Sequence, residues 1–234
     1  MATLADILQR QTVWRGRAAP AISAAPVAPT VPTGYAGLDA ELPGGGWPVG
    51  GLVEVLCHTE GIGELQIVLP ALAALTAAGH RVAWLAPPHL PYAPALRAAG
   101  VRLGQLTVIR APGRRDALWA AEQALRARSF HALLLWLPWA GYPELRRLAV
   151  AAQAGPGFAL AFRPPEAACE SSPAVLRLVL GAGEGQVAVQ ILKRRGLPLV
   201  VPLSVPIKRP AHALGRAPFS AVPTPGVVAR ACAA

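Results

Sequence analysis

The sequence predicts an α/β protein built on a doubly wound, mostly parallel β-sheet. Apolar, strand-like runs alternate with helical segments between residues 52 and 163, and each intervening segment is long enough to cross over the sheet. A turn rich in glycine joins strand-like runs at 175–180 and 186–194. Because short glycine turns connect antiparallel neighbours, this pair is expected to form a hairpin at one edge of the sheet.

The elements of the predicted core follow one another in a regular order. Strands are expected at 52–57, 81–86, 106–110, 132–137 and 157–163, ahead of the hairpin. Helices are expected at 64–78, 92–99, 115–128 and 143–154. Pro70 lies inside the first of these helices, where a proline costs roughly 3 kcal/mol or kinks the helix.

Composition divides the chain into three parts. Residues 1–32 are expected to be an N-terminal arm, with a short amphipathic helix and an Ala/Pro-rich linker. Residues 33–205 form the predicted core, and residues 206–234 form a basic tail rich in proline and alanine. Hydrophobic residues make up 53% of the chain and charged residues 15%, so most of it is expected to fold.

The chain carries a formal net charge of +10, from 22 Lys and Arg against 12 Asp and Glu. Such a balance favours partners that are polyanions. Only Lys193 and Lys208 are lysines, so the excess of arginine equally fits a GC-rich genome. The start of the chain has no apolar core of a signal peptide, and the cysteines lack metal-ligand spacing. A cytoplasmic protein without metal or membrane contact is expected.

The loop after the first long strand has the position of a phosphate-binding loop but not its chemistry. A phosphate loop needs glycines for close backbone approach, a Lys for the phosphate oxygens and a Ser or Thr for Mg²⁺. Here Gly61 is present, whereas Gly63 and Glu64 take the places of the Lys and the Ser or Thr. Glu64 is expected to cap the following helix, because a carboxylate interacts favourably with a helix N-terminus.

Two further absences predict a protein without nucleotide hydrolysis. The strand 132–137 ends in Leu135-Trp136-Leu137, where a phosphate-loop ATPase has an aspartate for Mg²⁺. The second strand is followed by Pro87-Pro88-His89 instead of a carboxylate base. We therefore expect no catalytic residue, no cofactor and no enzymatic activity.

Several longer strings resemble a known family. Thr33-Gly34 followed by Gly37-Leu38-Asp39 resembles the opening of the RecA ATPase core. The chain more closely resembles ImuA, a RecA-like accessory protein of bacterial translesion DNA synthesis, over residues 33–205. The strings that carry this resemblance are Leu42-Pro43-Gly44-Gly45-Gly46-Trp47-Pro48, Gly61-Ile62-Gly63-Glu64-Leu65, Pro87-Pro88-His89, Pro91-Tyr92-Ala93-Pro94, Trp119 with Glu122-Gln123-Ala124-Leu125, Arg146-Arg147-Leu148 and Leu192-Lys193-Arg194-Arg195-Gly196.

The resemblance implies a RecA-like fold with a degenerate P-loop and a role as a non-catalytic adaptor induced by DNA damage. The first implied partner is ImuB, which is an inactive relative of the Y-family polymerases. The others are an error-prone polymerase subunit of the replicative type and RecA. It also implies a location at the nucleoid after damage. Three alternatives remain: a nucleic-acid-binding module, an ATP-binding switch, and an inhibitor of cell division like SulA, which the chain resembles more distantly.

The C-terminal end is the strongest candidate for a contact surface. After Glu184 the chain has no acidic residue, while basic side chains continue to the end. The candidate contacts to a partner or to DNA are Lys193, Arg194, Arg195, Lys208 and Arg209. Among the tryptophans that could stack on bases, Trp139 is expected to be the most exposed, because it lies between proline and glycine.

Overall fold

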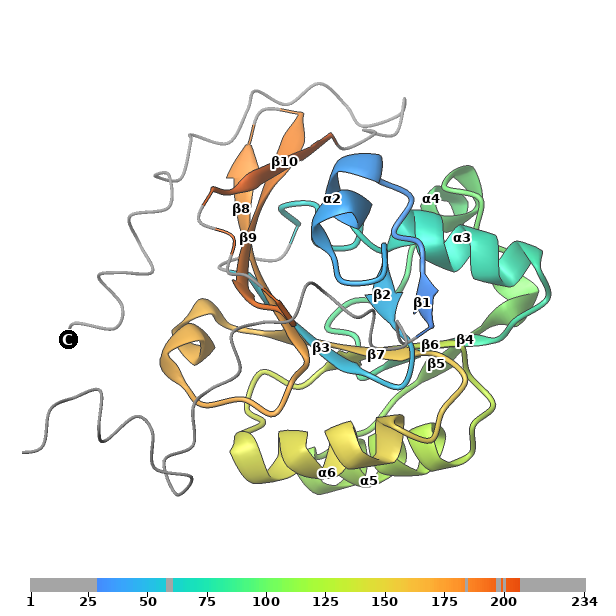
Figure 1. The fold of residues 1–234 in the computed structure, drawn as a ribbon. Coiled ribbons are helices and arrows are strands. Elements are labelled where there is room, and N and C mark those ends of the chain that lie inside the picture. The colour runs from blue at the N-terminus through green and yellow to red at the C-terminus, as the bar shows by residue number, and fades with distance from the viewer. Residues whose placement is uncertain (1–28, 58–60, 184, 197–198, 200, 207–234) are drawn as a thin grey trace, which may run out of the picture.

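The computed structural model describes residues 29–57, 61–183, 185–196, 199 and 201–206. Its centre is an eight-stranded mixed sheet with helices on both faces (Figure 1). The predicted N-terminal helix and the basic tail lie outside the described residues, as do Lys208 and Arg209.

The sheet has the strand order β10-β9-β8-β3-β7-β6-β4-β5. Its strands are β3 (Leu52–Cys57), β4 (Val82–Leu85), β5 (Leu106–Ile109), β6 (Ala132–Trp136), β7 (Phe158–Arg163), β8 (Leu176–Gly183), β9 (Gln186–Lys193) and β10 (Leu203–Pro206). The six strands from β8 to β5 are parallel, and β9 and β10 add in antiparallel fashion. The doubly wound α/β fold and its antiparallel hairpin are therefore as predicted.

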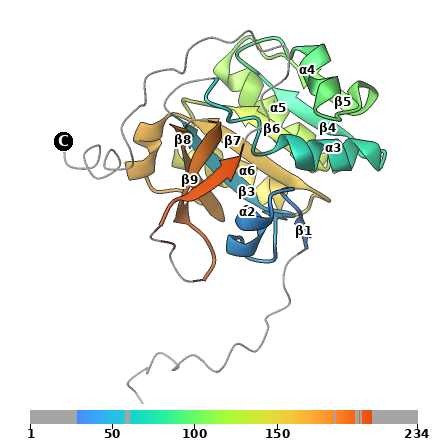
Figure 2. The ribbon, with the colours of Figure 1, turned by 90° about the horizontal axis from the view of Figure 1, so that it is seen from above.

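Side chains that alternate along the parallel strands pack into two separate hydrophobic layers, one on each face of the sheet. Val53 and Val55 face α2 (Ala36–Glu41), α3 (Leu69–Ala77) and α4 (Ala93–Ala98), which lie toward the viewer in Figure 2. Leu133 and Leu135 face α5 (Arg114–Arg126) and α6 (Tyr142–Ala152), which cover the opposite face. Burial on both faces explains why these strands read as continuous apolar runs.

The predicted helix at 64–78 is shorter than expected. Residues 64–68 form turns, and α3 begins at Leu69. Pro70 thus lies in the first turn, where its missing N–H breaks no helical hydrogen bond. A Cβ on Gly34 would come within 2.4 Å of the Pro70 Cβ, so the proline ring packs directly on the Gly34 backbone.

Short elements that the sequence pattern did not predict complete the fold. A two-stranded ladder joins β1 (Thr30–Val31) to β2 (Trp47–Pro48), so β1 lies inside the range assigned to the arm. The cluster Gly44-Gly45-Gly46 brings these strands together: Gly44 and Gly45 have positive φ, and a Cβ on Gly46 would lie 2.3 Å from the Val31 carbonyl oxygen. The 3-10 turns η1 (Leu103–Gln105) and η2 (Pro165–Cys169) precede β5 and β8.

A buried ion network holds the centre of the sheet to η2. Glu54 of β3 is fully buried, and its carboxylate accepts hydrogen bonds from Arg163 Nη1 at 2.8 Å and Arg177 Nε at 2.7 Å. Arg163 Nη2 also reaches Glu170 at 2.7 Å, and Arg177 Nη2 donates to the Ala167 carbonyl oxygen at 2.6 Å. Hydrogen bonding to both carboxylates raises the pKa of Arg163 against the opposing effect of burial. The network therefore stabilises the connection from β7 to β8.

Candidate functional site

The glycine loop after β3 is closed by its own carboxylate. The Gly61 N–H donates to both carboxylate oxygens of Glu64, at 3.0 and 3.2 Å, and the Gly63 N–H donates to one of them at 3.2 Å. Both glycines have positive φ, at 84° and 103°, which turns their N–H groups toward the same point. In a phosphate loop such N–H groups bind the anionic ligand. Here the protein supplies the anion itself.

This geometry corrects the expected role of Glu64. The helix that follows begins at Leu69, and its N-cap Val68 has no side-chain hydrogen bond. Glu64 therefore satisfies the N–H groups of the loop and does not cap the helix.

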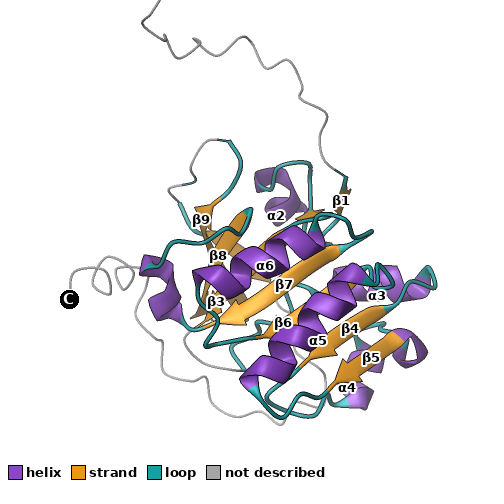
Figure 3. Cartoon of the chain, turned by 90° about the horizontal axis from the view of Figure 1, so that it is seen from below, coloured by secondary structure: helices purple, strands orange, loops and turns teal. Residues whose placement is uncertain are grey.

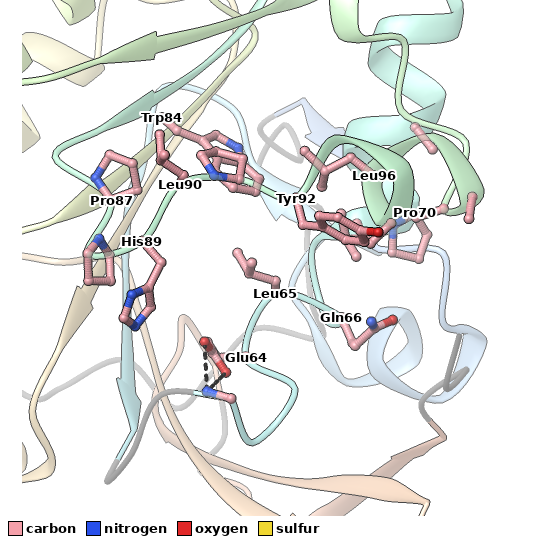
Figure 4. Close-up of a pocket in the computed structure, with 18 of the residues that line it drawn as sticks. Glu64, Leu65, Gln66, Pro70, Trp84, Pro87, His89, Leu90, Tyr92 and Leu96 are labelled. Carbon is pink, nitrogen blue, oxygen red and sulfur yellow. Dashed lines mark hydrogen bonds between the residues drawn. The ribbon is translucent and has the colours of Figure 1, made fainter. Parts of the chain in front are cut away.

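An open groove of about 940 Å³ extends from this loop along the carboxyl ends of β3, β4 and β6. Figure 4 shows Glu64 and His89 at one end and Tyr92, Pro70 and Gln66 at the other, with Leu65 between them and Trp84 near Leu90. Glu64 is the one carboxylate among its described lining residues, and these residues include no Lys or Arg. The groove is therefore lined mainly by apolar and aromatic groups.

The groove lies where open α/β sheets commonly bind ligands, beyond the carboxyl ends of the strands. Its wall between β4 and α4 is the segment Pro87–Tyr92, on which the Leu90 side chain is 73% exposed. Its floor includes Trp136 at the end of β6, whose ring stacks on Phe162 with centroids 4.8 Å apart. Trp136 thus occupies the place in which the sequence argument looked for a metal-binding aspartate, and its role there is aromatic packing.

The segment that contains Thr33 and Gly34 is tied to this loop from the N-terminal side. The Thr33 N–H donates to Asp39 Oδ1 at 2.8 Å, and the Tyr35 hydroxyl donates to the Gln66 carbonyl oxygen at 2.9 Å. Burial raises the pKa of Tyr35 above its ordinary value of 10.0, so this hydroxyl stays a donor at neutral pH. The string from Thr33 to Asp39 therefore positions the backbone around the groove, and its residue types are explained by these bonds.

The predicted basic contacts do not lie together at this groove. Lys193 ends β9, and its Nζ donates to the Ser172 carbonyl oxygen at 2.9 Å. Arg194 forms an ion pair with Glu41 at 2.9 Å and also donates to the Glu41 main-chain oxygen. Arg195 is exposed. Two of these side chains thus make contacts within the fold, which the density of charge in the sequence did not reveal.

The prediction that Trp139 is the most exposed tryptophan was wrong. Trp139 is half-buried, and Arg114 lies over its ring at 5.7 Å from the centroid. Trp119 of α5 is 63% exposed. Its exposure could have been predicted from helical spacing, because the buried residues Ala117, Ala121 and Leu125 mark the opposite side of α5.

The sheet order and the self-closed loop define the class: an open α/β protein whose strand-to-helix loop carries its own anion. No protein-family model matches the chain. Over 120 residues the chain is 32% identical to the cell division inhibitor SulA of Edwardsiella piscicida, a match that covers 51% of this chain and 71% of the relative. The chain belongs to the SulA family.

A crystal structure of SulA from Pseudomonas aeruginosa also matches, with 25% identity and a TM-score of 0.41 over 48% of this chain and 97% of that chain. Among the described residues, no helix is long and apolar enough to cross a membrane. The same residues contain no group of three or more His, Cys, Asp or Glu placed to hold a metal ion.

Proposed function

We propose that this chain is a non-catalytic binding protein of the bacterial DNA-damage response, which acts by contacts with other proteins. The observation that carries the proposal is the Glu64 carboxylate on the N–H groups of Gly61 and Gly63. A triphosphate would have to displace this carboxylate and then lie beside it, and like charges in a partly buried site repel strongly. An ATP-driven switch is therefore the least supported of the alternatives.

The groove supports protein binding in place of nucleotide binding. An apolar, aromatic lining with an exposed leucine at its edge fits the apolar side chains of a partner protein better than a charged phosphate chain. Burying Leu90 against a partner removes apolar surface from water, which favours association. The proposed occupant is an apolar segment of a partner in the DNA-damage response.

One candidate for the cellular role is an adaptor in translesion DNA synthesis. Its support is the resemblance to ImuA, whose strings extend over residues 33–205 and include Pro87–His89 and Tyr92 at the groove. The strand order also supports a RecA-like core, with β3 in the middle of the sheet between β7 and β8. On this proposal the partners are an ImuB-like inactive polymerase, an error-prone polymerase subunit and RecA.

The other candidate, inhibition of cell division, is better supported, because it rests on similarity to a known protein. The relative that is 32% identical to this chain is named a cell division inhibitor. A protein of that role would also act by binding and without catalysis, so the groove serves either candidate. The two candidates differ in what the cell loses when the protein is absent.

The test compares both losses in one strain. Deleting the gene for this chain is expected to abolish filamentous cells after DNA damage and to leave the frequency of damage-induced mutations unchanged. A lower mutation frequency with normal filamentous cells would establish the adaptor role in its place. A deletion strain that shows neither loss would overturn the role in the damage response.

A groove variant connects the phenotype to the site. Leu90→Asp places a charge on the exposed edge of the groove and is expected to reproduce the deletion, because it opposes burial of that edge. The matched control is Val201→Asp, because Val201 lies just before β10, is 70% exposed and is not part of the groove. Equal loss with both variants would show that the groove has no special role.

A further inference from the structure

Helices α5 and α6 lie side by side on one face of the sheet, and Figure 3 shows this pair as an outer layer that no other described element covers. Their outward residues form an arginine–tryptophan surface, defined here as Arg115, Trp119, Arg126, Arg146 and Arg147. We propose that this surface binds single-stranded nucleic acid, with Trp119 stacking on a base and the arginines contacting phosphates. This inference goes beyond the proposed function, which requires contacts with proteins alone.

The tryptophan is placed for contact and not for folding. Trp119 is 63% exposed, whereas the helix packs on the sheet through Ala117, Ala121 and Leu125. A large aromatic side chain that stays in water adds little to the free energy of folding, since that contribution comes from buried area. Its flat ring remains available to stack on a base.

The arginines flank this ring at helical spacing. Arg115 precedes Trp119 by one turn, and Arg126 follows it by two turns, so the three share one side of α5. Arg115 and Arg126 are about 16 Å apart along the helix axis. Arg146 and Arg147 lie on the outer side of the neighbouring helix. Arg115 and Arg126 therefore place positive charge on both sides of Trp119 along α5, over a length of several nucleotides.

The buried acidic residue between the two helices is paired with arginines. Glu122 is 8% exposed and pairs with Arg126 at 2.6 Å and with Arg147, whose side chains are 64% and 57% exposed. The carboxylate thus lies beneath guanidinium groups that retain N–H donors toward water. Asp116 and Glu144 lie in the first turns of α5 and α6, and the Glu144 carboxylate accepts the Gly141 N–H at 3.1 Å.

These features favour a single strand over other polyanions. A duplex hides the faces of its bases within the stack, whereas a single strand exposes them to an aromatic ring. An acidic protein face would pair with the arginines but would leave the Trp119 ring without a flat partner. Single-stranded DNA or RNA matches both the charge and the ring.

The experiment measures binding of the full chain to a fluorescein-labelled oligothymidylate by anisotropy, over a range of salt concentrations. Trp119→Leu keeps an apolar side chain without a stacking ring and is expected to weaken binding by about five- to hundredfold. Trp119→Phe keeps a ring and is expected to retain most of the affinity. Because Trp119 is exposed, both variants are expected to unfold at the wild-type temperature.

The arginines are tested by the salt dependence. The double variant Arg115→Gln and Arg146→Gln avoids the ion pairs of Glu122 and removes two phosphate contacts. The slope of log K against log salt is expected to fall by about 1.4, from about 0.7 for each phosphate contacted on a single strand. The matched control is Arg97→Gln with Arg102→Gln, which removes two exposed arginines, one on α4 and one at the start of η1. It is expected to leave the slope unchanged, because neither residue belongs to the arginine–tryptophan surface.

Several results would overturn the proposal. They are wild-type protein that does not bind the oligonucleotide, Trp119→Leu binding as tightly as wild type, and the control weakening binding as much as the surface variant. Binding that survives both surface variants but is lost on removing residues 207–234 would assign the contact to the C-terminal end. Surface variants that lose a partner protein while keeping the oligonucleotide would assign the surface to protein binding.

Discussion

The Glu64 carboxylate holds the Gly61 N–H with both of its oxygens, at 3.0 and 3.2 Å, across a turn of three residues. The contact makes a loop of phosphate-binding shape into a self-contained turn. It also links sequence to function directly, since the residue that replaces the Ser or Thr of a working loop supplies the negative charge that a phosphate would have supplied.

Removing this carboxylate is expected to loosen the loop without creating an enzyme. Glu64→Ala deprives two glycine N–H groups of their acceptor, at a cost of about 1 kcal/mol by analogy with loss of a helix cap. Thermal unfolding of the purified protein measures this cost. Phosphate release from ATP with Mg²⁺ and single-stranded DNA should stay at background in wild type and variant alike. Turnover by the wild type that Glu64→Ala abolishes would contradict the proposed lack of catalysis.

The buried ion network predicts a much larger effect at Glu54. Glu54→Ala leaves Arg163 and Arg177 buried, and the latter then has only main-chain acceptors in the network, so the free energy of unfolding should fall by about 3–5 kcal/mol. Chemical denaturation gives the measurement. Glu170→Ala is the matched control, because its side chain is 52% exposed, and water can replace its contact. A cost at Glu54 no greater than that at Glu170 would show that the network does not stabilise the centre of the sheet.

The periodicity of apolar residues was enough to predict the central sheet. Strand β3 begins and ends where the sequence placed it, and the other strands and helices predicted between residues 64 and 194 overlap those observed, because burial on both faces leaves long apolar runs. The short elements β1, β2 and β10 were not predicted. Their two to four residues carry no measurable periodicity, and they form because glycines and neighbouring strands bring them together.

The candidate site was predicted only in part, for a physical reason. The sequence shows that Glu64 replaces a hydroxyl residue, but only the backbone conformation at Gly61 and Gly63 shows that its carboxylate turns back onto the loop. Likewise, the basic string at Lys193–Arg195 looks continuous in the sequence. The fold divides it, since Arg194 turns inward to Glu41 and Arg195 outward to solvent.

Gly46 is expected to be the least replaceable residue of the glycine cluster. Gly46→Ala would place a Cβ 2.3 Å from the Val31 carbonyl oxygen, so β1 and β2 must separate, at a cost of roughly 1–3 kcal/mol. The matched control is Gly37→Ala, because a Cβ there meets nothing within 4 Å and alanine favours the helix α2. Thermal melts of the two variants should shift in opposite directions. A melt of Gly46→Ala like that of wild type would mean that the ladder tolerates the added methyl group.

Arg194 is expected to contribute to stability, unlike its neighbour. Arg194→Ala removes a largely buried ion pair with Glu41 and a hydrogen bond to the Glu41 main-chain oxygen, which should cost about 1–3 kcal/mol. Arg195→Ala changes an exposed side chain and should stay within about 0.5 kcal/mol of wild type. Denaturation curves for the two variants decide the matter. If the two variants gave the same denaturation curve, Arg194 would contribute no more to stability than Arg195. Both residues would then remain candidates for a contact surface.

The stacked histidines His80 and His131 predict a dependence of stability on pH. Their ring centroids are 3.8 Å apart, and within the described part of the chain His131 Nδ1 is buried without a hydrogen-bond partner. Burial, and to a smaller extent the charge of His80, lowers the pKa of His131 below its ordinary value of 6.5. Between the two pKa values the unfolded chain therefore binds a proton that the folded chain does not.

The direction in which stability changes with pH follows from this difference in proton uptake. Stability from His131 is fully present above about pH 6.5 and is lost as the pH falls from there toward the lowered pKa of the folded protein. The melting temperature should thus drop between about pH 7.5 and pH 5.5 in wild type, and by less in His131→Gln, which cannot take up a proton. The same drop in wild type and His131→Gln would show that other groups, and not the stacked pair, set the response to acid.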